Sequence, residues 1–219
     1  MPGQAPAPFH APKRSRFAER AFAWAWGHAH GSLERCYGKM KNELFADLKG
    51  HVVEIGPGAG INLEHVPAGV QVTGVEPNVF MHPLLHEAAA RTGVAFTAVE
   101  GYGEQLPFED NSVDAVISTL VLCSVFAPER VVGEVLRVLR PGGKFYFIEH
   151  VAAPTGTRRR RVQEWIAPLW GKVGDGCQPN RETWRVLEAA GFSDVKLEHR
   201  HVRTGLYPVT PHIIGTAVK

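Results

Sequence analysis

The sequence predicts one α/β domain: a seven-stranded, doubly wound sheet preceded by an N-terminal helical extension. Two observations carry this prediction. Short apolar runs of strand length alternate with longer amphipathic segments between about residues 52 and 150. The first of these runs ends in a glycine-rich turn, Gly56-Pro57-Gly58-Ala59-Gly60. Strands that alternate with helices form a parallel sheet with helices on both faces, and 219 residues fit one such domain.

The elements before the sheet are expected to be helical. Residues 1–14 are rich in proline and read as a disordered tail. Residues 15–48 follow as two helices, at about 15–30 and 33–48, and the first carries Phe17, Phe22, Trp24 and Trp26. We interpret this aromatic extension as a lid that closes over a site and excludes water. Peripheral contact with a membrane surface is the weaker alternative.

The core of the sheet is expected within residues 50–151. The predicted strands are 52–55, 71–75, 94–99, 112–119 and 144–150, and the helices between them are about 79–91 and 128–139. Residues 152–180, with Trp165 and Trp170, read as an insertion on the substrate side. Residues 181–219 then supply a helix at 181–190 and a terminal antiparallel pair of strands at 194–203 and 210–218.

Composition excludes several classes of protein. The net charge of +2 gives no electrostatic footprint of a dedicated nucleic-acid binder. No run of 18 apolar residues is present, so a spanning segment is not expected. Cys36, Cys123 and Cys177 are too scattered for a disulfide framework, and no pair has metal-ligand spacing. We therefore expect a cytoplasmic protein without a metal.

The glycine turn is the first sign of a cofactor site, because ligands of such sheets bind beyond the carboxyl ends of the strands. Gly56, Gly58 and Gly60, with Pro57 between them, let the backbone approach a ligand closely, and the helix expected next offers free amide donors. The dinucleotide-binding fingerprint would need a glycine at position 61, where this chain has Ile61, which argues against NAD as the ligand. Glu54, just before the turn, suits the ammonium group of S-adenosylmethionine (SAM), whose methionyl part carries no phosphate.

Three further motifs fall at strand ends. Glu76 follows the second strand, where an acid accepts both ribose hydroxyls. Each motif alone has an ordinary structural explanation, such as a plain turn or a solvated loop. Together, in register, they predict SAM binding, with Tyr37 capping the donor pocket. The predicted contacts are Glu76, Pro77 and Asn78 at the ribose, Tyr102, Gly103 and Glu104 around adenine, and Thr119 and Leu120 along the methionyl chain.

The core resembles the class I SAM-dependent methyltransferases, which have a Rossmann-like fold. Residues 106–114, Leu-Pro-Phe-Glu-Asp-Asn-Ser-Val-Asp, are similar to the ubiquinone and menaquinone methyltransferase branch. The segments that point more narrowly are 119–125, 149–152, 175–177, 181–184 and 211–213. Together these resemble the methyltransferase-like seven family, thiol S-methyltransferases of animals. The resemblance implies SAM as methyl donor, S-adenosylhomocysteine as product and a small-molecule thiol as acceptor.

Two departures from that family are visible. The family usually begins with a membrane-anchoring segment, which is absent here, so we expect a soluble relative. Its acid after the second strand is usually aspartate, whereas this chain has Glu76.

His150, at the end of the fifth strand, is the candidate catalytic residue. A thiolate is the nucleophile in thiol chemistry, so His150 could act as a base or, when protonated, stabilise the thiolate. The alternative is that it only holds its loop. Asp175 and His212 are second-tier candidates, with turn capping as the alternative explanation for Asp175 and simple packing as the alternative for His212. Cys123 and Cys177 are expected to be small core residues, since methyl transfer needs no enzyme thiol.

Alternatives remain at the level of function. One is methylation of carbon, oxygen or nitrogen on a quinone precursor, a phospholipid or another small molecule. A second is a binding module without catalysis, against which the intact glycine turn and Glu76 argue. The run Arg158–Arg161 reads as a solvated helix face that could also guide an anionic substrate.

Overall fold

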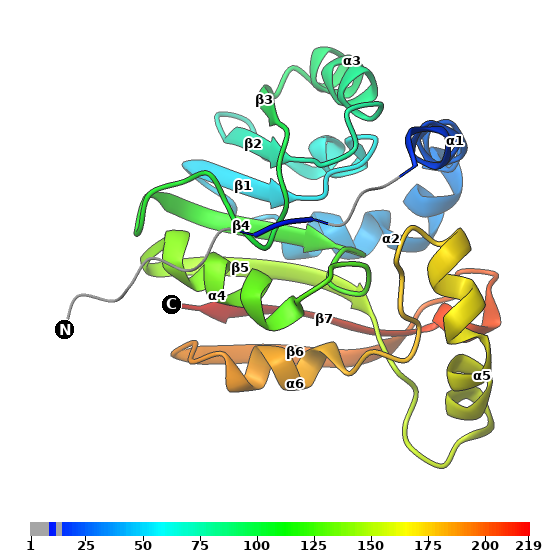
Figure 1. Ribbon diagram of the computed structural model, residues 1–219. Helices are drawn as coiled ribbons and strands as arrows, with labels where there is room; N and C mark the ends of the chain where they lie inside the picture. Colours follow the sequence, from blue (N-terminus) through cyan, green and yellow to red (C-terminus); the bar gives the residue numbers. More distant parts are fainter. Residues whose placement is uncertain (1–8, 12–14) are drawn as a thin grey trace.

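A computed structural model describes residues 9–11 and 15–219 and confirms the predicted architecture (Figure 1). The described residues form one seven-stranded sheet in the order β3-β2-β1-β4-β5-β7-β6. All pairs from β3 to β5 are parallel, and β7 is antiparallel to both β5 and β6. The strands are β1 (His51–Ile55), β2 (Gln71–Val75), β3 (Ala95–Val99), β4 (Val113–Thr119), β5 (Leu139–His150), β6 (Asp194–His201) and β7 (Pro211–Val218).

Helices cover both faces of this sheet. They are α1 (Arg16–Gly27), α2 (His30–Leu44), α3 (His82–Thr92), α4 (Pro128–Val138), α5 (Arg158–Val173) and α6 (Thr183–Ala189), with short 3-10 helices η1 (Ile61–His65) and η2 (Tyr207–Val209). The apolar face of α4 packs with α6 against β4 and β5, while α3 and the end of α2 cover the other face. The core is therefore split into two layers by the sheet, as a doubly wound fold requires.

The N-terminal extension is fixed to the sheet. The Ser15 hydroxyl accepts a hydrogen bond from the Ala18 amide at 3.5 Å and so begins α1. The Asn78 side chain, just after β2, donates to the Glu19 carbonyl at 2.9 Å. Of the expected tail, residues 1–8 and 12–14 lie outside the described residues. Phe9 is described, and its amide donates to the Gln105 side chain at 2.9 Å.

The structure differs from the predictions in two places. The helix expected after the glycine turn is only the five-residue η1, so it offers no long helical N-terminus. The strand β5 begins at Leu139 and runs through Pro141-Gly142-Gly143, where a turn was expected. Within the ranges that the structure describes, no helix combines the length and the apolar character needed to cross a bilayer.

Candidate active site

A cavity of about 700 Å³ opens at the carboxyl ends of β1, β2, β4 and β5. It is of the size and mostly apolar character typical of small-molecule sites. Of the residues predicted from sequence, those that line it are Tyr37, Glu54, Gly56, Pro57, Glu76, Pro77, Asn78, Tyr102, Gly103, Glu104, Thr119, Leu120, His150 and Asp175. Gly58 and Gly60 belong to the same glycine turn, although they are not among the lining residues.

The glycine turn has the backbone that its sequence predicts. Gly58 has a φ of +57°, and a Cβ built on it would lie 3.1 Å from Nε1 of Trp26. A side chain at this position would thus be strained and would press against α1. The Gly58 amide donates to Oε2 of Glu76 at 3.1 Å, which joins the turn to the end of β2.

Glu76 is buried, and its carboxylate orientation is fixed by backbone amides. Besides the bond from Gly58, its Oε1 accepts from the Asn78 amide at 2.9 Å. A carboxylate offers about four lone-pair sites, so a fixed Glu76 can still accept the hydroxyls of a ligand. Its side chain lines the cavity, which is the placement predicted for a ribose-binding acid.

Glu54 is a buried acid of the site with only one of its two carboxylate oxygens hydrogen-bonded within the described part of the chain. It is 1 % exposed, and its Oε1 accepts from Asn62 at 2.6 Å. Its Oε2 is buried and has no hydrogen-bond partner among the described residues. Burial raises the pKa of Glu54 to about 7, although the charge of Lys41 works in the opposite direction. An orphaned carboxylate oxygen facing a cavity is suited to a cationic donor from a ligand.

Lys41 is a site residue that the sequence analysis missed. It lies on α2, is 3 % exposed and lines the cavity, and burial lowers the pKa of its amine. Helix α2 carries no strand-end motif that would have pointed to it.

The loop after β3 lines the cavity and also makes contacts within the protein. The Glu104 side chain accepts from the amides of Phe126 and Ala127, at 2.7 and 3.3 Å, and so holds the segment that precedes α4. The Tyr102 ring lies 5.6 Å from that of Phe9 and 6.4 Å from that of Phe126. Tyr102 thus belongs to an aromatic cluster at the cavity edge.

The end of β4 lies close to Glu54, because the Asn62 side chain bonds both Glu54 and Thr119. The Thr119 hydroxyl accepts from Nδ2 of the Asn62 side chain at 3.0 Å. Leu120 has a φ of +60°, a left-handed conformation that is costly for a side chain with a Cβ. Leu120 is nevertheless held there by its amide, which donates to the Ile148 carbonyl at 2.8 Å. The strained turn sits in the cavity wall, where such strain is commonly found.

Tyr37 and His212 form a buried pair. His212 Nδ1 lies 3.0 Å from the Thr210 carbonyl, which can only accept, so Nδ1 carries the proton. The Tyr37 hydroxyl then donates to Nε2 at 2.8 Å. Burial lowers the pKa of His212 to about 4 and raises that of Tyr37, so both are neutral near pH 7. Of the two interpretations of His212 from the sequence, this buried pairing favours the packing one.

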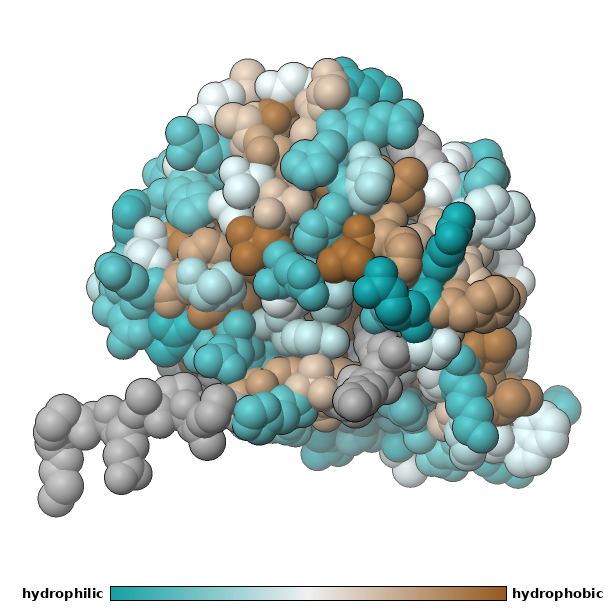
Figure 2. All heavy atoms as spheres, turned by 45° about the horizontal axis from the view of Figure 1, so that its top comes forward, coloured by the Kyte–Doolittle hydropathy of each residue, from teal (hydrophilic) through white to brown (hydrophobic). Residues whose placement is uncertain are grey.

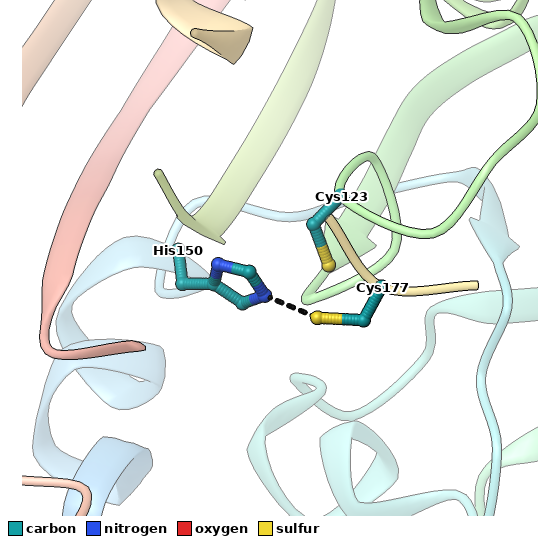
Figure 3. Close-up of side chains that lie close together, drawn as sticks. All are labelled: Cys123, His150 and Cys177. Carbon is teal, nitrogen blue, oxygen red and sulfur yellow. Dashed lines mark hydrogen bonds between the residues drawn. The ribbon is translucent and has the colours of Figure 1, made fainter. Parts of the chain in front are cut away.

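His150 lies in a cluster with two sulfur atoms that the sequence did not predict (Figure 3). Its Nε2 is 3.0 Å from Sγ of Cys177, and the Trp170 indole donates to the same sulfur at 3.1 Å. Cys123 points at the same spot from the turn after β4. The neighbouring Cys123 thiol, and after it the hydrogen bond with His150, lower the pKa of the Cys177 thiol. Cys123 and Cys177 are buried as expected, but they are not merely core residues, since both line the cavity.

Asp175 begins the short turn that brings Cys177 to the cavity. It has a φ of +54°, and Gly176 follows at +89°. A Cβ on Gly176 would lie 2.9 Å from the Ser124 carbonyl oxygen, so only glycine allows this close approach. The geometry agrees with the turn-forming interpretation of Asp175, while its side chain lines the cavity as a catalytic role would also require.

The side of the cavity opposite the sheet is covered by α1 and α5. Phe22 and Trp26 stack at 5.3 Å between ring centroids and line the cavity. Other apolar side chains of these elements face outward, and Figure 2 shows apolar surface at the right-hand margin, the side on which α1 and α5 lie in Figure 1. The exposed members are Phe17 and Trp24 of α1 and Trp165, Leu169 and Val173 of α5, joined by Leu206 and Tyr207 at η2, which contacts α5.

The fold and the glycine turn are typical of SAM-dependent methyltransferases, and comparison with known proteins agrees. A family model described as a methyltransferase domain matches residues 53–147. Among solved structures, a phosphoethanolamine N-methyltransferase of Haemonchus contortus aligns with a TM-score of 0.70 at 17% identity, over 94% of this chain and 60% of that one. A SAM-dependent methyltransferase of Thermotoga maritima aligns with a TM-score of 0.66 at 21% identity, over 94% and 100% of the chains.

Curated relatives narrow the class. Thiol S-methyltransferase TMT1B of Mus musculus is 44% identical over 199 residues, which cover 84% of this chain and 82% of that protein. Thiol S-methyltransferase TMT1A of Homo sapiens is 43% identical over 190 residues, covering 82% and 78%. The chain belongs to this family of SAM-dependent thiol S-methyltransferases.

Proposed function

We propose that the protein transfers the methyl group of SAM to the sulfur of a small-molecule thiol. The observation that carries the proposal is the shared cavity: the glycine turn and Glu76 line one part, and His150 lines another. Donor and acceptor would therefore meet in one largely apolar space. The names of the relatives, thiol S-methyltransferases, support the same acceptor class.

The donor side has the groups that SAM requires. The orphaned Oε2 of Glu54 would accept from the ammonium group, and the fixed carboxylate of Glu76 would accept from the ribose hydroxyls. The backbone of Gly56 approaches this space without a side chain, and Tyr102 and Gly103 would flank the adenine. When bound, SAM supplies a methyl group on a sulfonium centre.

On the acceptor side, the chain mainly positions and desolvates the reactants. The walls formed by α1 and α5 would keep water from the reactants, and His150 at the end of β5 would promote loss of the thiol proton. Cytoplasmic action stays a prediction from the sequence, as does contact of the exposed aromatic side chains with a membrane surface.

The test is a methylation assay with SAM and a mixed panel of acceptors, read by mass spectrometry. The panel holds alkyl and aryl thiols, hydrogen sulfide, phenols, amines and quinone precursors. We expect methylated products from thiols and S-adenosylhomocysteine in equal amount. Products confined to phenols, amines or quinones would contradict the thiol assignment and favour the second candidate from the sequence, methylation at oxygen, nitrogen or carbon.

A further inference from the structure

Three potential metal ligands meet at the acceptor end of the cavity. Sγ of Cys123, Sγ of Cys177 and a ring nitrogen of His150 all lie within 4.8 Å of one another, and all three residues are buried. They come from the turn after β4, the segment after α5 and the end of β5, and they point toward one another in Figure 3. Two thiols and one imidazole form a donor set that zinc prefers.

The backbone holds the two sulfur-bearing segments together. The Gln178 amide donates to the Cys123 carbonyl at 2.8 Å, directly beside both cysteines. The Arg181 guanidinium donates to the carbonyls of Leu122 and Val125, at 2.6 and 2.8 Å, on either side of Cys123. Gly176 allows the same two segments to touch at the Ser124 carbonyl. The ligands are thus placed in advance by groups other than themselves.

A tetrahedral zinc ion would fit between the three ligand atoms after a small shift. With Zn–S near 2.3 Å and Zn–N near 2.0 Å, the sulfur atoms would be roughly 3.8 Å apart and sulfur and nitrogen roughly 3.5 Å apart. His150 Nε2 and Cys177 Sγ are now 3.0 Å apart, at hydrogen-bond distance. Loss of the shared proton and a shift of under about 1 Å would open room for the metal. The Trp170 indole already donates to Cys177 and would serve as an outer partner of that ligand.

We propose that Cys123, His150 and Cys177 bind a zinc ion whose fourth position faces the cavity and accepts the sulfur of the substrate. Three protein ligands with an open fourth position are the arrangement of a catalytic zinc site. The identity of that fourth ligand rests on the proposed thiol methyltransferase function, whereas zinc binding itself does not. In this arrangement His150 holds the metal and is no longer the base.

The chemistry follows from the metal charge. The thiol loses its proton to solvent as its sulfur binds zinc, because a coordinating thiol is deprotonated. A lone pair of that sulfur forms the new bond to the methyl carbon, and the bond from this carbon to the sulfonium breaks, its electron pair staying on the cofactor sulfur. The products are a neutral thioether and S-adenosylhomocysteine. A thioether is a poorer zinc ligand than a thiolate, which favours release.

Metal content tests the site directly. We expect the full-length protein, purified without chelators, to contain about one zinc per chain by inductively coupled plasma mass spectrometry. Cys123→Ala and Cys177→Ala should each retain less than about a tenth of it after dialysis against a chelator. Cys36→Ala is the matched control, because Cys36 lies outside the cluster, and it should keep its zinc. Circular dichroism verifies that each variant is folded.

Cobalt substitution and measurement of turnover after zinc removal complete the test. Cobalt added to metal-free protein should give a thiolate-to-metal charge-transfer band that Cys177→Ala lacks. Protein that keeps free Cys123 and Cys177 but takes up neither zinc nor cobalt would overturn the proposal, as would a disulfide between the two or full turnover after zinc removal. Zinc bound by the cluster, with no methylation of any thiol, would instead refute the proposed function and leave the metal site standing.

Discussion

At the scale of single residues, burial tunes the acid that precedes the glycine turn. Glu54 has one paired oxygen and one orphaned oxygen, and burial raises its pKa to about 7. Below that pH the empty site therefore holds Glu54 protonated and neutral. An ammonium group can pair with it only after the proton leaves, so cofactor binding and proton release are linked.

The affinity for SAM should accordingly rise with pH. Between pH 5.5 and 7 we expect the dissociation constant to fall by up to about tenfold per pH unit, and to level off above pH 7 as Glu54 ionises. Isothermal titration calorimetry in buffers of different ionisation enthalpy measures both the affinity and the released proton. Glu54→Gln should bind weakly with a flat profile. An unchanged slope in that variant would show that another group titrates.

Sequence alone could identify most residues on the donor side, because strand ends mark them. Glu54 and Glu76 follow directly from the position of the first two strands. The cysteine cluster could not be found in this way, since 27 residues separate His150 from Cys177 and no spacing rule joins them. Lys41 was not predicted as a cavity residue for the same reason, because its position depends on how α2 packs on the sheet, and sequence spacing does not show this.

At the scale of elements, α1 lines the cavity with Phe22 and Trp26, and its role as a lid stays a prediction. Trp26 lines the cavity and lies against Gly58, whereas Trp24 on the same helix is 70 % exposed. The two tryptophans thus form a natural matched pair. One faces the site and the other faces away from it.

Trp26→Ala should weaken SAM binding about tenfold, or about 1.4 kcal/mol, since it removes an aromatic wall beside the glycine turn. Trp24→Ala should change the affinity by less than about twofold, because an exposed side chain contributes little. Calorimetric titration of both variants decides the point. Equal effects, or no effect of either, would contradict a role of α1 as a lid.

A comparison of the predicted and observed elements shows which sequence patterns locate strands and helices correctly. The sequence pattern located all seven strands: the inner ones are marked by apolar runs because they are buried, whereas the edge strand β6 is largely exposed and carries alternating polar residues. It did not locate η1, since the Gly60–His65 segment is too short to show a helical period. The length of β5 was also underestimated: Pro141 and the glycines after it are typical of turns, and here they form an irregularity inside the strand, where Gly142 has a φ of +75° and the pairing with β4 shifts register.

At the scale of the whole molecule, a ligand that binds only the folded chain stabilises every element at once. S-adenosylhomocysteine at a hundred times its dissociation constant should add about 2.7 kcal/mol to the free energy of unfolding. For a chain of this size that corresponds to a rise in Tm of about 5 to 10 °C. Differential scanning calorimetry measures it. Glu76→Gln at the same ligand concentration should show a clearly smaller rise, and an equal rise would exclude Glu76 as a ligand-binding group.

Most of the acceptor end of the cavity comes from the later part of the chain, although Cys123 does not. The methyltransferase domain match ends at residue 147, yet His150, Trp170 and Cys177 on the acceptor side all come later. Substitutions in this later part can therefore reshape which acceptors fit without disturbing the glycine turn or Glu76. The part of the chain that would hold the methyl donor can thus stay constant while the part that contacts the acceptor varies. Evolution, or an engineer, could change its substrate while its methyl donor stayed the same.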